Sequence, residues 1–430
     1  MGVLILIVFA VLLILAVPIA FVIGGTGAIG ILATPGGSDE LPVIPQQIFT
    51  SINSFSLLTV PLFIFAGTIM AQGGVATRLM NFAQGTVGRG KGGLGVAIVV
   101  SALFFHGISG SSTADTAAIG RVTLPTLKQQ RYPVGFSAAL LAAAGATALL
   151  IPPSIDLIIV GLVANISIAG LFAGGVIPAI INALGLIVWV IYQARRHKYG
   201  GDTRPVSAAE ISRDFVKAIP ALFMIVIILG GILGGIFTPT EASVVAVVYG
   251  LFIAMFVYRD LKVSMLIKVF RTSIELCGVV MLIIAMGGVL SYAFTINQVP
   301  VELATWIEQV AHNKIIFLLM VQVLFFIIGM IMDGVPAEII LMPILTPIAV
   351  SYGIDPIHFG ILVVANVGLG LAHPPVGLCL NTACAVAKIP LEKAIRPLLP
   401  FIAIQWVTLL VITYAEDFTM FLPRVLHLAN

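Results

Sequence analysis

The sequence has few charged residues for its length. Asp, Glu, Lys and Arg make up only 9% of its 430 residues, whereas a soluble domain carries about 25%. So little charge cannot coat a soluble particle, which excludes a cytosolic enzyme, a secreted disulfide scaffold and a disordered hub protein. The formal net charge of +3 also offers no basic surface for nucleic acid. The 60% of hydrophobic residues instead predict an all-α polytopic membrane protein.

Cysteine and amino-terminal charge are also scarce. The three cysteines, Cys277, Cys379 and Cys384, lie in apolar stretches without CxxC or Cys/His spacing. We therefore expect neither a disulfide framework nor a structural metal. The first 22 residues are apolar but lack the Lys or Arg that begins a signal peptide. We expect a first membrane span that is retained rather than a cleaved leader.

The prolines and small residues of the first half of the chain recur at matching positions in the second half. Prolines and small residues recur in the same order at a nearly constant offset, which chance rarely produces in an apolar chain. The matched pairs are Thr50 with Thr272, Gly107 with Gly329, Pro125 with Pro347, Pro152-Pro153 with Pro374-Pro375, and Pro178 with Pro400. We predict a first repeat over 1–191, a cytoplasmic linker over 192–217 and a second repeat over 218–430.

Two segments, 94–130 and 315–350, are apolar on both flanks and polar at their centre. Each apolar arm spans roughly 15–17 residues, fewer than the ~20 that a full crossing requires. We therefore predict one re-entrant hairpin in each repeat, beside five full spans. An odd number of spans makes the two repeats inverted with respect to one another.

The positive charges support this arrangement. If the amino terminus is outside, all of the 21 Lys and Arg residues except Lys314 and Arg424 fall on the cytoplasmic side, as the positive-inside rule expects. Both termini are then periplasmic. The stretches 44–53 and 260–275 alternate apolar and polar residues, which predicts two interfacial arm helices along the lipid headgroups.

Polar residues gather at the hairpin centres and at two helix breaks. The glycines and hydroxyl residues of 107–115 could form an oxygen cage for a hard cation such as Na⁺, or simply a tight turn. Pro152-Pro153 and Pro374-Pro375 interrupt the fourth span of each repeat and free backbone carbonyls, although packing kinks alone would also need them. Broken helices and hairpins at equivalent positions of two repeats indicate a transport site near the middle of the membrane.

Together these motifs resemble a known family. The Ser-Gly-Ser-Ser-Thr-Ala-Asp run over 109–115 and the two Pro-Pro breaks are similar to the large membrane subunit of tripartite ATP-independent periplasmic (TRAP) transporters. The resemblance covers nearly the whole chain. It implies a Na⁺-driven elevator-type importer in a bacterial inner membrane, working with a separate four-span membrane subunit and a periplasmic solute-binding protein.

The resemblance also implies roles for individual residues, with two or more coupling Na⁺ ions. One Na⁺ would be held by Ser109, Ser112, Gly145 and Thr147. Another would be held by Gly334, Asn366, Gly368 and Gly370. The substrate would face Ser111, Ser112, Ser154 and Asp333.

The substrate implied is an organic acid. Overall likeness favours the sialic-acid branch. Separately, a polyhydroxylated monocarboxylate such as N-acetylneuraminate suits a serine-rich pocket with one Asp. A C4-dicarboxylate permease is the alternative. His106 and His373 leave a proton-coupled carrier open, and a passive channel or an ATP-driven permease are further rivals. Gly107-Ile108-Ser109-Gly110 also matches the nucleophile turn of a rhomboid-like intramembrane protease, but a two-fold repeat has no use in such an enzyme.

Overall fold

The structure is a computed structural model that describes residues 2–88, 90–200 and 207–429. Within these ranges every regular element is a helix and no strand is present. Eight of the described helices are long and apolar enough to cross a membrane, and six shorter helices are also apolar. The predicted fold class, an all-α polytopic membrane protein, is confirmed.

The helices follow the chain in two comparable series. The first series is α1 (Gly2–Ile14), α2 (Ile19–Leu32), α3 (Val43–Ile52), η1 (Phe55–Leu58), α4 (Thr59–Gln72), α5 (Val75–Val87), α6 (Gly93–Ser109), α7 (Ser112–Gln129), α8 (Val134–Ala148), α9 (Ile155–Val163) and α10 (Ile168–His197). The second series is α11 (Ala208–Leu233), α12 (Pro239–Phe252), η2 (Ile253–Val257), α13 (Val263–Ile296), α14 (Val299–Val310), α15 (Lys314–Ile331), α16 (Gly334–Ser351), α17 (Pro356–Leu371), α18 (Leu378–Ala387), α19 (Glu392–Tyr414) and α20 (Asp417–Val425).

Capping residues set several of these boundaries. Thr238 and Glu241 form a capping box at the start of α12, in which each side chain accepts the backbone N–H of the other residue. Asp355 caps α17 just before Pro356, a residue that suits the first position of a helix because it lacks an N–H. These local signals fix where the chain re-enters a helix after each turn.

Each predicted hairpin segment forms a pair of helices. Both helices of the second pair are among the eight long enough to cross a membrane, so the re-entrant path stays a prediction. α6 and α7 cover the segment 94–130, and α15 and α16 cover 315–350. Gly110 lies at the first tip with φ +67°, a conformation that favours glycine. Each hairpin is followed by a broken helix, α8–α9 or α17–α18, with a cis Pro-Pro peptide bond at the break. The inverted relation between the two series stays a prediction.

The second arm helix is a correction. The stretch 260–275 does not form a separate element, because α13 runs through it without interruption as a 34-residue helix. The first arm does form a separate helix, α3, which has no buried residue. Helices α5, α14 and α20 were not expected from the sequence. In the linker, α10 and α11 extend into both ends of 192–217, while 201–206 lie outside the described residues.

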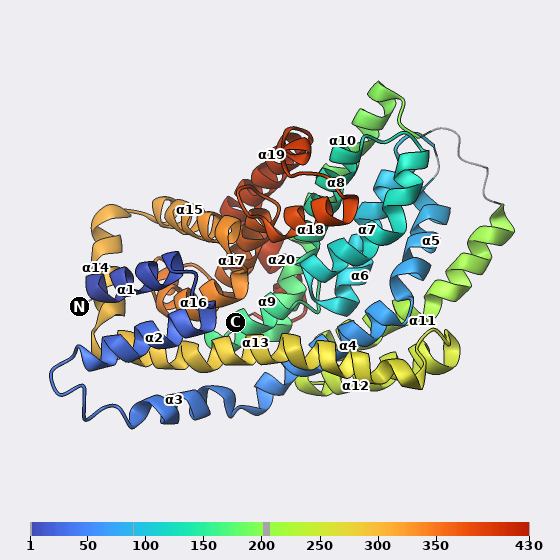
Figure 1. Ribbon diagram of the computed structural model, residues 1–430. Coiled ribbons are helices and arrows are strands. Elements are labelled where there is room, and N and C mark those ends of the chain that lie inside the picture. Colours follow the sequence, from blue (N-terminus) through green and yellow to red (C-terminus); the bar gives the residue numbers. More distant parts are fainter. Residues whose placement is uncertain (1, 89, 201–206, 430) are drawn as a thin grey trace.

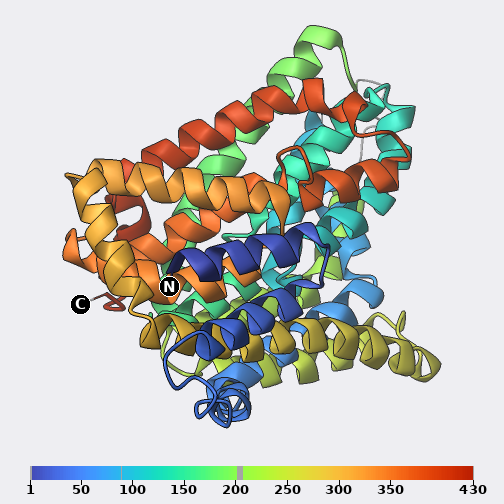
Figure 2. The same ribbon diagram turned by 60° about the vertical axis from the view of Figure 1, so that its left-hand side comes forward.

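The longest helix organises one side of the molecule. Figure 1 shows α13 along one edge of the molecule, with α2 and α3 beside it, and the turned view of Figure 2 shows the same grouping. α4 also packs on α13, and α12 packs on α4. The hairpins and broken helices lie together on the other side of this layer.

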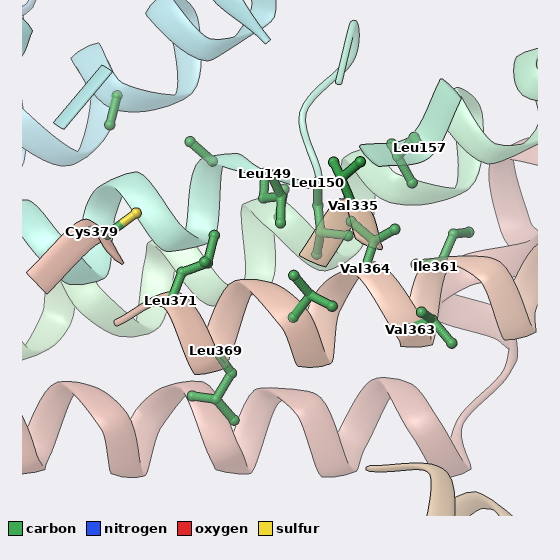
Figure 3. Packing of buried hydrophobic residues seen from close by; sticks show 14 of the residues in the cluster. Leu149, Leu150, Leu157, Val335, Ile361, Val363, Val364, Leu369, Leu371 and Cys379 are labelled. Atoms are coloured by element: carbon green, nitrogen blue, oxygen red, sulfur yellow. The ribbon is translucent and has the colours of Figure 1, made fainter. Parts of the chain in front are cut away.

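The core lies among the broken helices. α8 is buried at every position from Phe136 to Ala148, and its many alanines let neighbouring helices approach closely. Figure 3 shows α17 beside α8, with Val364 and Leu371 facing Leu149 and Leu150. The first break is buried at Pro152 and Pro153, whereas at the second break Pro374 is half-buried and Pro375 is exposed.

Candidate functional site

The first hairpin tip lies directly on the first helix break. A β-carbon at Gly107 would lie 3.2 Å from the carbonyl oxygen of Pro152, and one at Gly110 would lie 3.2 Å from that of Pro153. Two main-chain segments approach this closely only when at least one lacks a side chain. The break and the tip are therefore one packed unit.

Ser112 and Gly145, two of the predicted Na⁺ ligands, lie side by side. A β-carbon at Gly145 would lie 3.2 Å from the Ser112 carbonyl oxygen and would overlap the Thr116 hydroxyl. The Thr116 hydroxyl donates to the same carbonyl at 2.8 Å. The Ser112 side-chain oxygen is buried and has no hydrogen-bond partner in the part of the chain that the structure describes. A buried oxygen without a partner costs stability, and a bound cation would relieve that cost.

Ser109 belongs to a buried network that the sequence reading missed. Its hydroxyl donates to the carboxylate of Asp115, and it accepts the backbone N–H of Ser111 at 3.2 Å. The other carboxylate oxygen of Asp115 lies 2.7 Å from Nδ1 of His106. All three side chains are buried. The network ties the end of α6 to the start of α7 and fixes the shape of the tip.

The Thr147 hydroxyl has hydrogen-bond partners of its own. It donates to the Ala143 carbonyl at 2.8 Å and accepts the Gln405 amide at 3.1 Å. Residues two apart on a helix lie on nearly opposite faces, so Thr147 faces α19 while Gly145 faces α7. The structure therefore does not bring the Thr147 hydroxyl to the first tip.

The four residues predicted to face the substrate all lie at helix starts. Ser111 precedes α7 and is half-buried, Ser112 begins that helix, and Asp333 precedes α16 with an exposed side chain. Ser154 is buried and caps α9 by accepting the Leu157 N–H at 3.5 Å. Helix N-termini carry partial positive charge and favour anions, so these positions suit a carboxylate.

The second hairpin tip rests on the second break in the same way. The N–H groups of Val376 and Gly377 both donate to the Met330 carbonyl at 3.2 Å. A β-carbon at Gly370 would lie 2.6 Å from the Gly329 Cα, so the two backbones touch. Gly334, the first residue of α16, packs against the side chain of Val367.

Asn366 and Gly368 complete the second predicted set. The Asn366 amide nitrogen donates to the Leu362 carbonyl at 2.7 Å, whereas its side-chain oxygen is buried and has no partner among the described residues. Gly368 approaches the Ala146 carbonyl of α8, where an added β-carbon would lie 2.9 Å away. Gly368 therefore marks the crossing of the two broken helices and faces α8 rather than the second hairpin.

The sequence that forms these elements matches a known transporter family. The profile described as "Tripartite ATP-independent periplasmic transporter, DctM component" matches residues 6–418. The chain belongs to this family. It is thus the large subunit of a TRAP transporter, a multi-pass inner-membrane protein, and not an enzyme. Membership also implies a small membrane subunit and a periplasmic binding protein as partners.

Individual relatives agree over nearly the full length. The C4-dicarboxylate TRAP transporter large permease protein DctM of Pseudomonas aeruginosa is 38% identical over 407 residues, covering 95% of both chains. The isethionate TRAP transporter permease protein DctMQ of Oleidesulfovibrio alaskensis is also 38% identical, over 96% of this chain and 65% of that protein. The YdaH transporter of Alcanivorax borkumensis has a similar fold, with a TM-score of 0.66 at 14% identity over 88% of this chain and 89% of that one.

This TRAP large subunit also carries buried carboxylates at the meeting point of its two series. Asp115, Asp156 and Glu338 are buried, although none was predicted as a site residue. Cys379 at the start of α18 interacts electrostatically with Asp115, Asp156 and Asp333, which come from both series. The sequence places these residues far apart, so only the tertiary packing of α7, α9, α16 and α18 reveals the cluster.

A cationic cavity opens at the other end of the first hairpin. It has a volume of about 340 Å³, lies between α7 and the end of α18, and includes Arg121, Lys128 and Lys388 in its lining. These three residues fall on the predicted cytoplasmic side. Their charge would attract an organic anion.

Proposed function

We propose that the chain couples the entry of Na⁺ to the uptake of an organic acid delivered by a periplasmic binding protein. The observation that carries this proposal is the pair of buried, unpartnered oxygens on Ser112 and Asn366 within the described residues. Each belongs to a different predicted Na⁺ set and each lies beside a hairpin or a break. Hard oxygen ligands of this kind suit an alkali cation.

The first Na⁺ would lie at the first tip, near Ser112 and Gly145. Ser109 would contribute its main-chain oxygen, because its hydroxyl already donates to Asp115. Thr147 would also contribute its main-chain oxygen, because its hydroxyl already donates to the Ala143 carbonyl. The second Na⁺ would lie near Asn366, with main-chain oxygens supplied by the remaining members of its set. Those members are Gly334, Gly368 and Gly370.

The substrate proposal is a carboxylate or a similar small anion. The names of the Pseudomonas and Oleidesulfovibrio relatives concern C4-dicarboxylates and isethionate, both organic acids. In this chain Ser111, Ser112, Ser154 and Asp333 would contact the substrate, and the helix starts beside them would favour its negative charge. N-acetylneuraminate stays our prediction, and a C4-dicarboxylate is the alternative that the Pseudomonas relative supports.

We further propose an elevator mechanism with both termini periplasmic. The two inverted repeats, 1–191 and 218–430, would each contribute one hairpin and one broken helix to a moving unit. The close tip-to-break contacts at Gly110 and Gly370 support movement as one body. The layer around α13 would serve as the fixed scaffold.

The test is uptake into proteoliposomes that contain this chain, its small subunit and its binding protein. Labelled N-acetylneuraminate and a labelled C4-dicarboxylate are offered separately, under an inward Na⁺ gradient or an inward K⁺ gradient of equal size. We expect uptake of one of the two acids under the Na⁺ gradient alone. Uptake that is equal under both gradients, or that needs only a proton gradient, would contradict the proposal.

A further inference from the structure

Two buried carboxylates lie where the second hairpin meets the first broken helix. Asp156, in the first turn of α9, is 6% exposed, and Glu338, near the start of α16, is fully buried. The two helices pack on one another, and Figure 3 shows Leu157 and Val335 from them near each other above α17. The negative charges of Asp156 and Glu338 repel one another across this contact. Neither belongs to the Na⁺ or substrate sets proposed above.

Nothing described in the structure neutralises this pair. Both carboxylate oxygens of Glu338 and Oδ1 of Asp156 lack a hydrogen-bond partner within the described ranges. Within those ranges no Lys, Arg or His forms an ion pair with either residue. Burying an unpaired carboxylate is strongly unfavourable, because the charge loses its hydration without gaining a partner. The pair therefore needs a positive charge or a proton.

The local charge calls for at least one positive charge. Asp156 lies in the first turn of α9, whose N-terminus contributes roughly half a positive charge there. Glu338 lies beyond the first turn of α16, so the N-terminus of that helix offsets little of its charge. Within the described ranges the pair is not joined by a third His, Cys, Asp or Glu side chain into the cluster of three or more that typically holds a divalent or transition metal. A divalent ion such as Ca²⁺ takes about six to eight oxygen ligands and is poorly served here. A monovalent cation that prefers hard oxygen ligands fits this pair of carboxylates best.

We propose that Asp156 and Glu338 form a further Na⁺ site that links the second hairpin to the first broken helix. The exposed carboxylate of Asp333 at the start of α16 acts electrostatically on both residues and would attract the ion toward them. The site rests on the proposed Na⁺ coupling for its role in transport. Its binding of Na⁺ can be measured without any substrate.

The experiment counts radioactive Na⁺ bound per purified full-length chain in lipid nanodiscs, with choline replacing Na⁺ to hold ionic strength constant. Glu338→Gln and Asp156→Asn each remove one charge and preserve side-chain shape. Glu275→Gln is the matched control, because Glu275 is an exposed carboxylate that pairs only with Arg271 of its own helix within the described residues. Thermal unfolding in choline is recorded for the same proteins.

We expect Glu338→Gln and Asp156→Asn to bind one Na⁺ fewer per chain than the unchanged protein, and Glu275→Gln to bind the same number. Both site variants should also unfold at a higher temperature in choline, because an uncompensated buried charge is gone. If both site variants bind as many Na⁺ ions as the unchanged protein, the proposed Na⁺ site is wrong. The two carboxylates would then share a proton instead.

A variant that does not fold leaves the proposal testable. Glu338→Asp keeps the charge but shortens the side chain, so we expect a higher half-saturating Na⁺ concentration. An unchanged value would overturn the site. The outcome is also separable from the transport proposal: if Na⁺-driven uptake fails while Na⁺ binding still depends on Glu338, the site stands and the proposed coupling is wrong.

Discussion

Replacing Gly370 by alanine tests whether the second hairpin must rest directly on the second break. The new β-carbon would lie 2.5 Å from the Gly329 carbonyl carbon, 2.6 Å from its Cα and 2.9 Å from the Met330 nitrogen. Ordinary van der Waals contact begins at 3.4 Å, so α15 would have to withdraw by roughly 1 Å. All three atoms belong to the main chain, and no side-chain rotation can relieve the overlap.

The energetic consequence follows from this overlap. Inserting a methyl group into a packed interior costs about 1–3 kcal/mol. Asn366 lies one helical turn before Gly370, so a displaced hairpin would open the second proposed Na⁺ site. If the full cost falls on the Na⁺-bound state, the half-saturating Na⁺ concentration rises about 5- to 150-fold.

The assay is thermal unfolding of the purified chain during a Na⁺ titration, at ionic strength held constant with choline. Gly230→Ala is the control, because a β-carbon there meets nothing within 4 Å of it among the described residues and alanine favours a helix interior by about 1 kcal/mol. We expect Gly370→Ala to need far more Na⁺ for the same stabilisation and Gly230→Ala to need the same amount. A Gly370→Ala protein with unchanged Na⁺ dependence would refute the reasoning.

The remaining predictions address the first tip, the second site and the orientation. Ser112→Ala and Asn366→Ala each delete one unpartnered oxygen and should abolish Na⁺-driven uptake while expression stays normal. Asp115→Asn leaves a buried hydrogen-bond network incomplete, at a cost of about 1–3 kcal/mol, and should lower the unfolding temperature. In a chain freed of its own cysteines, Lys314→Cys should react with a membrane-impermeant maleimide from the periplasm, and Lys198→Cys only after permeabilisation.

Each of these has a contradicting outcome. Normal uptake in both alanine variants would mean that the Na⁺ sites lie elsewhere. An Asp115→Asn protein as stable as the unchanged one would remove the structural role of the network. Labelling of Lys198→Cys in intact cells would reverse the orientation.

The two helix pairs could be predicted from the sequence, but the second arm helix could not. The polar centre that separates the two helices of each pair is visible along the chain. The expected shortness of the arms does not hold for the second pair, because α15 and α16 are each long enough to cross a membrane. The stretch 263–275 has an arm-like alternation, yet no glycine or proline separates it from the following span. Nothing ends the helix there, and α13 continues through it. Between α3 and α4 there is likewise no glycine or proline, but Asn53 and Ser54 leave the helical conformation and separate α3 from α4. Asn and Ser side chains compete with the helix for backbone hydrogen bonds.

The candidate site was predictable where the ligands are local and not where they meet only in three dimensions. Ser112 stands in a polar stretch, and Asn366 is an isolated amide in an apolar segment that leads to a Pro-Pro break, so the sequence alone singles them out. Helix geometry could have shown that the Thr147 side chain points away from the first tip, because Thr147 lies on nearly the opposite face from Gly145. Asp156 and Glu338 come from different series, and their contact depends on the packing of α9 against α16.

The most direct test of the central claim is a simultaneous measurement of Na⁺ and substrate entry into proteoliposomes that contain the complete transporter. Radioactive Na⁺ and a differently labelled organic acid are followed in the same vesicles after the binding protein is added outside. The account predicts that at least two Na⁺ ions enter with each substrate molecule, and that Ser112→Ala stops both fluxes. Substrate entry without any accompanying Na⁺ would contradict it.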